Sequence, residues 1–363
     1  GETLEFATYL GGSESESVTA IDVDTRGCVY VTGVTQSSDF PTSAGAIRTT
    51  FAGYSEAFVV KLAPDGSSLE YSTFLGGELT ESGEDIFVDR DSGECIVVGY
   101  SHSIDFPTTA GAFDRDPYGW DAFICGINHN GSALRFSSFL GDEGQDWARG
   151  MTIDSNGNIV VCGFTSSDQF PTTGTAFQQR RTGLEDGFVT VMDARATRVI
   201  RSTYLGGSAD DWCEDVVVTT DGNIAIFGRT EGNNLPVTTN ALSTTYLGGD
   251  NDGFLTIVNS DLDQIVYSTY VGGSDDDQPR DLATDILGNI YLVGRTKSPD
   301  FPKTNNAFNN SSTGDDEEFF LQMVDHLGTE LILSTFVGGG GMDRCNGIAI
   351  NMNGSLILAG STN

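Results

Sequence analysis

Short apolar stretches alternate with polar, glycine-rich stretches along the whole chain. Residues 13–77 contain four of them, at 18–24, 28–33, 57–62 and 69–75. They are rich in Val, Ile, Phe and Tyr, while Gly, Asp, Asn and Pro lie between them. This composition favours extended strands joined by tight turns, and no stretch has the 3.6-residue period of an amphipathic helix. We therefore expect four β-strands in this segment and almost no helix.

The pattern of residues 13–77 recurs along the chain. Each repeat ends in Leu-Gly-Gly or a close variant, at spacings of 65, 65, 65, 66 and 66 residues, and the motif begins at Leu10, Leu75, Leu140, Leu205, Val271 and Val337. Tandem four-stranded units are typical of a β-propeller, because one unit cannot bury both faces of its sheet but a ring of units can. We predict an all-β fold with a single β-propeller domain over residues 1–363.

A glycine falls within the second strand of every repeat. Glycine inside a strand usually marks a bulge or a close approach of another backbone. We expect both strands to pack tightly near the propeller axis at these positions: Gly33, Gly99, Gly163, Gly228, Gly294 and Gly360.

Several motifs carry a family resemblance. The segments 267–274 (YSTYVGGS), 165–173 (TSSDQFPTT) and 57–62 (AFVVKL) resemble the SBBP β-propeller repeat family, and the likeness extends over essentially the whole chain. The resemblance implies a secreted or cell-surface protein of bacteria or archaea, often multidomain, with no catalytic residues. The family name suggests seven blades, and the count in this chain differs.

The repeats predict six blades of four antiparallel strands. Five are complete, at 13–77, 78–142, 143–207, 208–273 and 274–339. Residues 340–363 supply the first two strands of a sixth, and residues 1–12 align with a fourth strand, so we expect the N-terminal strand to close the ring. The second and fourth strands of a blade run in the same direction, so an antiparallel sheet needs a third strand between them. That strand comes either from the rest of a longer protein or from another chain by strand addition.

The charge is strongly acidic, with 52 Asp and Glu, three lysines and a formal net charge of −34. This charge argues against nucleic acid or an anionic membrane as partner, and no apolar run is long enough to insert into a membrane. The surface suits an ordinary acidic secreted protein or a saline or calcium-rich setting, where cations screen the repulsion.

The six cysteines are scattered and form no C-x-x-C pair, which argues against zinc. Most are expected to be single buried thiols. Cys95 opens a second strand and Cys125 lies late in the neighbouring third strand, so a cross-strand disulfide between them is one hypothesis.

Candidate catalytic residues are lacking. The only histidines are His102, His129 and His326, and there is no Ser-His-Asp pattern, phosphate-binding glycine loop or H-E-x-x-H motif. Acid residues are too abundant to single out a glycosidase pair. We therefore predict no catalytic residues and no enzymatic activity.

One acid recurs six residues after the start of every Leu-Gly-Gly motif. The loops that carry it share one face of a propeller, so the six acids form a ring there: Glu16, Glu81, Asp146, Asp211, Asp277 and Asp343. Two interpretations stay open. Each carboxylate caps backbone amides of its own loop or binds the neighbouring blade, or the ring is a metal site for calcium, which favours clustered oxygen ligands. Calcium is the only cofactor that the sequence suggests.

A second recurring element is a Phe-Pro or Leu-Pro loop, at 40–41, 106–107, 170–171, 235–236 and 301–302. Repetition in each blade favours a role in pinning the long loop to the sheet over a ligand platform. The loop tips that follow vary freely, as in 114–120 against 178–182, which suits recognition better than catalysis.

Together with the secreted or cell-surface location that the family resemblance implies, these patterns predict an extracellular or cell-surface structural or interaction module. It would bind protein partners or assemble with itself, for example as a subunit of a filament or surface layer. The alternatives are a carbohydrate-binding lectin and a propeller enzyme that acts on polysaccharide. A central funnel with convergent acids and aromatics favours the enzyme, and shallow pockets repeated in each blade favour the lectin.

Overall fold

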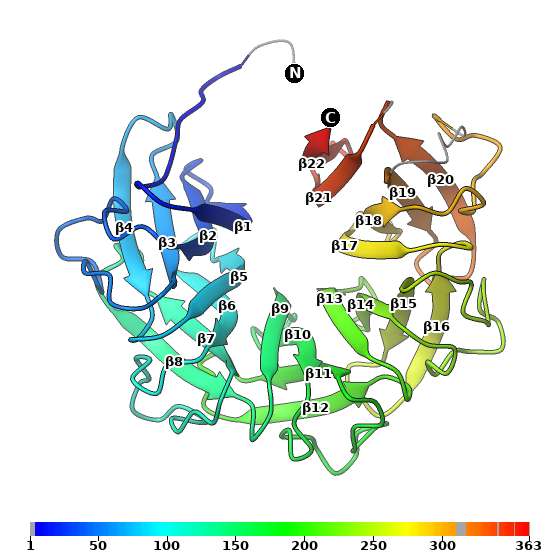
Figure 1. The fold of residues 1–363 in the computed structure, drawn as a ribbon, viewed down its shortest axis with the longest axis horizontal. Coiled ribbons are helices and arrows are strands. Elements are labelled where there is room, and N and C mark those ends of the chain that lie inside the picture. The colour runs from blue at the N-terminus through cyan, green and yellow to red at the C-terminus, as the bar shows by residue number, and fades with distance from the viewer. Residues whose placement is uncertain (1–3, 310–316, 340, 352, 363) are drawn as a thin grey trace.

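A computed structural model describes residues 4–309, 317–339, 341–351 and 353–362, and these contain strands but no helix. Four-stranded antiparallel sheets stand around a central axis as the blades of a propeller (Figure 1). In each blade the first strand is innermost and the fourth is outermost. No helix in the described part of the chain is long and apolar enough to cross a membrane.

The five complete blades follow one another in chain order. The first comprises β1 (Glu16–Val23), β2 (Val29–Thr35), β3 (Glu56–Leu62) and β4 (Leu69–Leu75). The second comprises β5 (Glu81–Val88), β6 (Cys95–Ser101), β7 (Asp121–Ile127) and β8 (Leu134–Leu140). The third comprises β9 (Asp146–Ile153), β10 (Ile159–Thr165), β11 (Asp186–Met192) and β12 (Val199–Leu205). The fourth comprises β13 (Asp211–Val218), β14 (Ile224–Thr230), β15 (Asp252–Val258) and β16 (Ile265–Val271). The fifth comprises β17 (Asp277–Thr284), β18 (Ile290–Thr296), β19 (Glu318–Val324) and β20 (Leu331–Val337).

The propeller prediction is confirmed, but the closed ring of six blades is wrong. After the fifth blade comes a sheet of only two strands, β21 (Asp343–Ile350) and β22 (Leu356–Thr362). Residues 4–12 form no strand, and the ring is open between β1 and β21 (Figure 1). The physical reason is strand direction: without a third strand, β22 and an N-terminal fourth strand would run the same way and could not pair as antiparallel neighbours.

The N-terminal segment packs against the first blade instead. Leu10 contacts an apolar cluster on that blade, which includes Phe58 and Phe74. The Phe6 ring lies against Gly66, as the Tyr71 ring of the first blade lies against Gly131 of the second. The segment therefore occupies the place of a fourth strand from a preceding blade, in line with the sequence alignment. Residues 1–3 of the predicted closing strand lie outside the described residues.

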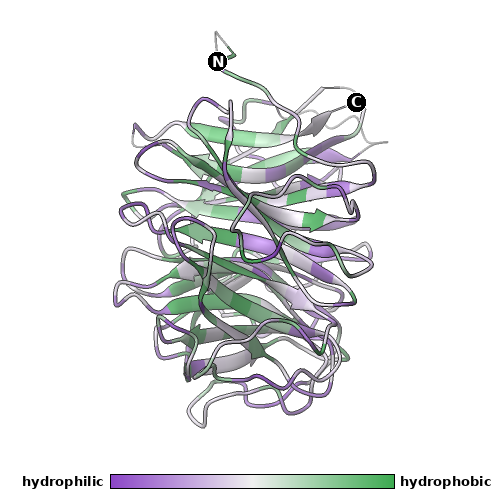
Figure 2. Ribbon diagram, turned by 90° about the vertical axis from the view of Figure 1, so that its left-hand side faces the viewer, coloured by the Kyte–Doolittle hydropathy of each residue, from purple (hydrophilic) through white to green (hydrophobic). Residues whose placement is uncertain are grey.

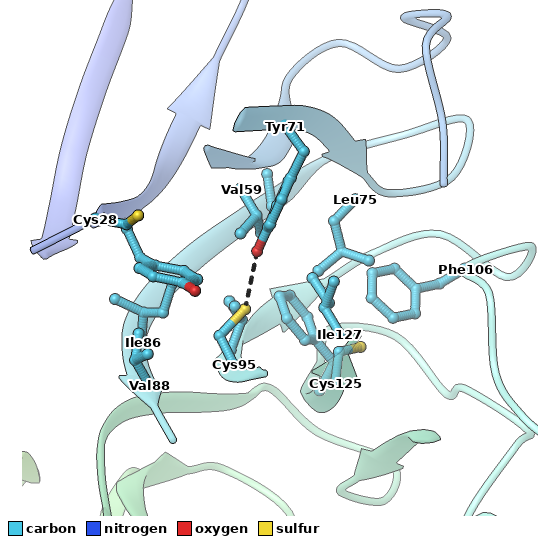
Figure 3. Close-up of a cluster of buried hydrophobic side chains, with 14 of the residues drawn as sticks. Cys28, Val59, Tyr71, Leu75, Ile86, Val88, Cys95, Phe106, Cys125 and Ile127 are labelled. Atoms are coloured by element: carbon cyan, nitrogen blue, oxygen red, sulfur yellow. Dashed lines mark hydrogen bonds between the residues drawn. The ribbon is translucent and has the colours of Figure 1, made fainter. Parts of the chain in front are cut away.

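The apolar core lies between the blades. Figure 2 shows hydrophobic residues concentrated in the strands and hydrophilic residues in the loops. One cluster joins the first and second blades, where Val59, Tyr71 and Leu75 meet Ile86 and Ile127 (Figure 3). Similar clusters fill the next three junctions, and a smaller one joins the fifth blade to β21–β22. Wherever two blades adjoin, their sheets thus bury the facing sides against each other, as the repeat predicted.

The disulfide hypothesis is wrong. All six cysteines are free and buried. In the sheet, Cys95 stands opposite Ile127, and Cys125 stands opposite Val97, so the two thiols are out of register. The Cys95 sulfur lies 3.4 Å from the Tyr71 hydroxyl (Figure 3), and burial raises the pKa of both thiols to about 12.

A β-bulge explains the recurring glycine. The first strand of every sheet shifts register opposite this glycine, as between Val18 and Ala20 opposite Gly33. A Cβ added at Gly163 would lie 1.8 Å from the Trp147 carbonyl oxygen. Since backbone cannot yield as a flexible side chain can, only glycine fits, which confirms the predicted close approach.

We predict that Gly163→Ala destabilises the protein by roughly 2–3 kcal/mol, because the methyl group overlaps backbone in a packed sheet. The matched control is Gly174→Ala, where an added Cβ meets nothing within 4 Å. Urea denaturation followed by circular dichroism measures both. Equal midpoints for the two variants would contradict the prediction.

Candidate functional site

The six predicted carboxylates each stand at the first position of a first strand. Five are buried, and Glu16, at the open side of the ring, is half-buried. Each accepts the backbone N–H of the residue four positions earlier: Gly12–Glu16 at 3.2 Å, Gly77–Glu81 at 3.0 Å, Asp142–Asp146 at 2.9 Å, Gly207–Asp211 at 2.6 Å, Gly273–Asp277 at 2.7 Å and Gly339–Asp343 at 2.8 Å.

These hydrogen bonds match the interpretation in which each acid caps its own loop. A hydroxyl of the second strand often adds a contact, as where Thr35 donates to Glu16 at 2.8 Å and Ser101 donates to Glu81 at 2.9 Å. Within the described residues, no three His, Cys, Asp or Glu side chains gather in a way that could hold a metal ion. Calcium binding by the ring of six stays a prediction.

A second set of buried acids was missed by the sequence analysis. Each is the first residue of a third strand. Strand pairing places it opposite a Thr or Ser of the second strand, and the same Thr or Ser stands opposite the first-strand acid. They are Glu56, Asp121, Asp186, Asp252 and Glu318. The sequence contains a pattern that could have revealed them, because in every complete repeat this acid stands two residues before a phenylalanine.

The two sets meet between the blades. The third-strand acid of one blade lies beside the first-strand acid of the next, and we call these two residues a junction pair. At the fourth junction, between the fourth and fifth blades, a Cβ added to Gly272 would stand 2.7 Å from an oxygen of Asp252 and 2.7 Å from an oxygen of Asp277. The first glycine of the Leu-Gly-Gly motif therefore leaves room for both carboxylates.

The junction pairs favour bound protons. Burial, and then the nearby Asp146 carboxylate, raises the pKa of Asp121 to about 7. Burial, and then Asp277, does the same for Asp252, while burial raises the pKa of Asp277 itself to about 6. Two adjacent buried carboxylates cannot both ionise cheaply without a compensating charge.

Charged side chains also converge in the central channel. The bulge in each first strand turns one residue toward the axis, and Glu84, Arg149, Glu214 and Arg280 occupy this position in successive blades. They line a cavity of about 320 Å³. Arg149 pairs with Glu84 at 2.9 Å, and Arg229 pairs with Glu214 at 3.4 Å.

The next residue along three of these strands is a half-buried aspartate that binds the backbone of a neighbouring blade. Asp85 accepts the N–H of Met151 at 2.8 Å, Asp215 that of Leu282 at 3.1 Å, and Asp281 that of Ile348 at 2.7 Å. Burial, and then the charge of Asp281, raises the pKa of Asp215 well above its usual range, and the two carboxyl groups are hydrogen-bonded. These acids accept hydrogen bonds from backbone N–H groups, so their role is structural.

All three tryptophans lie in one aromatic ladder across the second to fourth blades. His102 stacks on Trp120 at 4.5 Å, Tyr100 on Trp147 at 4.0 Å, and Phe164 on Trp212 at 4.2 Å. Arg229 covers Trp212 at 3.6 Å from the ring centre. The ring faces thus contact one another rather than a free surface. Sequence reasoning missed the ladder because its members occupy repeat positions that are aromatic in only one or two blades.

The recurring Phe-Pro loops act as pins, as the sequence favoured. Their apolar residues are buried against the sheets, and Phe40, for example, stacks on Phe58 at 4.7 Å. The set comprises Phe40, Phe106, Phe170, Leu235 and Phe301.

Comparison with known proteins supports the repeat assignment. The SBBP β-propeller repeat model matches residues 5–41 and 266–302, which confirms the resemblance over these stretches. Both matches begin in a fourth-strand segment and end at the Phe-Pro loop, in agreement with the place of the N-terminal segment. Among curated proteins, no sequence match reaches significance.

Solved structures share the fold at low identity. The NanB sialidase from Streptococcus pneumoniae aligns with a TM-score of 0.52 and 9% identity, over 99% of this chain and 67% of that one. An ulvan lyase of family PL25 aligns with a TM-score of 0.51 and 11% identity, over 94% and 76%. BamB from Moraxella catarrhalis aligns with a TM-score of 0.42 and 9% identity, over 94% and 82%. At such identities the likeness shows the propeller fold alone.

The raised pKa values predict a lower melting temperature at pH 8 than at pH 5, in chelator at constant ionic strength. A carboxyl whose folded-state pKa exceeds its unfolded value of about 4 stabilises the folded state. This stabilisation is complete below about pH 4, and it is lost as the pH rises through the folded-state pKa of about 7. Asp121→Asn should reduce this dependence, and the exposed Asp116→Asn, which removes the same charge, should not. Scanning calorimetry measures both, and a melting temperature that rises from pH 5 to pH 8 would contradict the prediction.

Proposed function

We propose that the chain is a non-enzymatic interaction module of a secreted or cell-surface protein, and that a strand from another part of the protein or from another chain pairs with β22 at the open ring. The observation that supports this proposal is the free edge of β22. In the complete blades the second strand pairs on both sides, as β2 does with β1 and β3, whereas β22 pairs with β21 alone. An unpaired edge presents a row of N–H and C=O groups that another strand can bind.

The shape of the β22 edge also indicates which kind of strand would fit it. In complete blades a third-strand phenylalanine packs on the second-strand glycine, as Phe254 does on Gly228 and Phe320 on Gly294. Gly360 holds the same position in β22, opposite Cys345. A strand with phenylalanine facing Gly360 would therefore fit. The third strands of the five complete blades have this pattern, but each is already paired on both sides in its own blade.

Two further features support an interaction role. Three apolar side chains of β1 face the opening and are exposed, namely Val18, Ile21 and Val23. Exposed apolar residues beside an open edge favour association. The acids that converge in the channel bind backbone or arginine, which leaves little for catalysis.

A second candidate function rests on the channel itself. The cavity gathers glutamates from several blades, and convergent acids are one of the two features expected of a propeller enzyme that acts on polysaccharide. Incubation with acidic and neutral polysaccharides, with Glu214→Gln as the comparison, tests it: turnover or binding that the variant loses would favour this function over the first.

We predict that a synthetic peptide of residues 250–260 binds the protein through β22. Fluorescence anisotropy should show saturable binding, and Phe254→Ala in the peptide should weaken it at least tenfold, because the ring facing Gly360 is lost. Equal binding of both peptides would contradict the proposal.

A further inference from the structure

The third blade has a polar pocket in the loop between its second and third strands. The pocket has a volume of about 590 Å³ and is lined by residues 168–172 and 179–181 of this loop. Small-molecule sites in proteins have volumes of roughly 300–1,000 Å³, so the pocket is large enough for such a ligand. Its lining includes part of the variable loop tip at 178–182, a segment whose variation suits recognition.

Arg181 fixes the shape of this loop. Its guanidinium donates hydrogen bonds to Asp168, shortly after β10, and to the Gly183 carbonyl oxygen, shortly before β11. Loop positions can be matched between blades from the N–H that donates to a fourth-strand threonine. Counted in this way, the first and fourth blades have an aromatic residue in place of the arginine, Phe51 or Tyr246, which packs on a fourth-strand ring. The third blade therefore builds its loop differently.

Arg180 brings an uncompensated positive charge to the pocket. Its side chain lines the pocket, is exposed, and forms no salt bridge or hydrogen bond with any described residue. The matching residues of the first, second and fourth blades are Thr50, Asp116 and Thr245, none of which is a cation. Of the 18 lysines and arginines in the chain, only Arg180 and Arg181 are neighbours in the sequence.

The third blade is also the part of the chain that repels an anion least. Residues 143–207 contain six arginines and seven acids, whereas residues 78–142 contain three arginines and twelve acids, and residues 208–273 contain one arginine and ten acids. The total charge of −34 opposes the approach of any anion. A site for an anionic ligand is therefore most favourable on this blade.

The other groups in the lining are suited to hydroxyl groups. The Gln169 amide is exposed and has no hydrogen-bond partner among the described residues. The Thr172 hydroxyl is half-buried and donates only a long hydrogen bond, at 3.5 Å, to the Gln179 carbonyl oxygen. Phe170 also lines the pocket, but it is only 3% exposed, so its ring offers no surface for stacking. Recognition here must rely on charge and hydrogen bonds.

We propose that the third-blade pocket binds an acidic sugar, whose carboxylate or sulfate group pairs with Arg180 and whose hydroxyl groups bind Gln169 and Thr172. A guanidinium donates two parallel hydrogen bonds to the oxygens of such an anionic group. Because no aromatic ring is available for stacking, a neutral sugar should bind at least tenfold more weakly. This inference depends neither on strand addition at β22 nor on the central channel.

Calorimetric titration of the whole chain at low ionic strength tests the proposal. The probes are trigalacturonate, which carries only carboxylates, and a sulfated galactose trisaccharide, which distinguishes the two anionic groups; maltotriose is the neutral control. At least one acidic probe should bind at one site per chain. Arg180→Gln should weaken this binding at least tenfold, because the charge-assisted pair is lost. Arg198→Gln removes the same charge from an exposed turn of the same blade and should bind as the parent protein does.

A second variant tests the neutral part of the pocket. Gln169→Ala should weaken binding severalfold and leave the melting temperature unchanged, because this side chain contacts no described residue. Failure of both acidic probes to bind the parent protein would overturn the proposal. Equal weakening by Arg180→Gln and Arg198→Gln would show a general charge effect and would overturn it too. Equally tight binding of a triglutamate peptide would show recognition of charge without a sugar, and binding lost in Glu214→Gln but kept in Arg180→Gln would place the ligand in the channel; either result has the same consequence.

Discussion

Blade-to-blade packing is the constraint on which the rest of this structure depends. A four-stranded sheet has two apolar faces, and wherever two blades adjoin, the facing sides are buried against each other, as at the cluster around Val59 and Ile127. The same packing places the ends of loops and strands in a buried environment of low dielectric constant. Their amides must then find acceptors, which is why a carboxylate such as Asp211 recurs at the start of each first strand.

This solution creates a second problem, since it buries negative charge. Each junction gathers one acid from each blade, and the chain compensates in different ways: with Arg48 at the first junction and with the Gln178 amide at the third. Elsewhere the raised pKa values of Asp121 and Asp252 show that a proton is held more tightly in the folded state. Stability of the ring is thereby linked to pH and to cations.

The sequence predicted the architecture well because the repeat compares the chain with itself. Strand order, the tight approach at Gly163 and the burial of Phe40 all follow from patterns seen in every repeat. The same comparison applied to the third strands would have revealed Asp252 and its counterparts. Ring closure could not be predicted in this way, because it depends on contacts between distant parts of the chain, which a comparison of repeats does not reveal. The aromatic ladder around Trp147 was equally hidden, since its positions are aromatic in only one or two blades.

The open ring and the acidic junctions are two consequences of one geometry. Where a blade has a neighbour, its buried acids meet a partner acid and its apolar face meets another face. At the opening neither occurs: Glu16 is half-buried rather than buried, and the apolar side chains of β1 are exposed. A strand or blade that filled the opening would bury both, and it would bring a further carboxylate toward Glu16. Association at the opening would thus carry the same electrostatic cost as the internal junctions, so cation concentration and pH should influence assembly as well as stability.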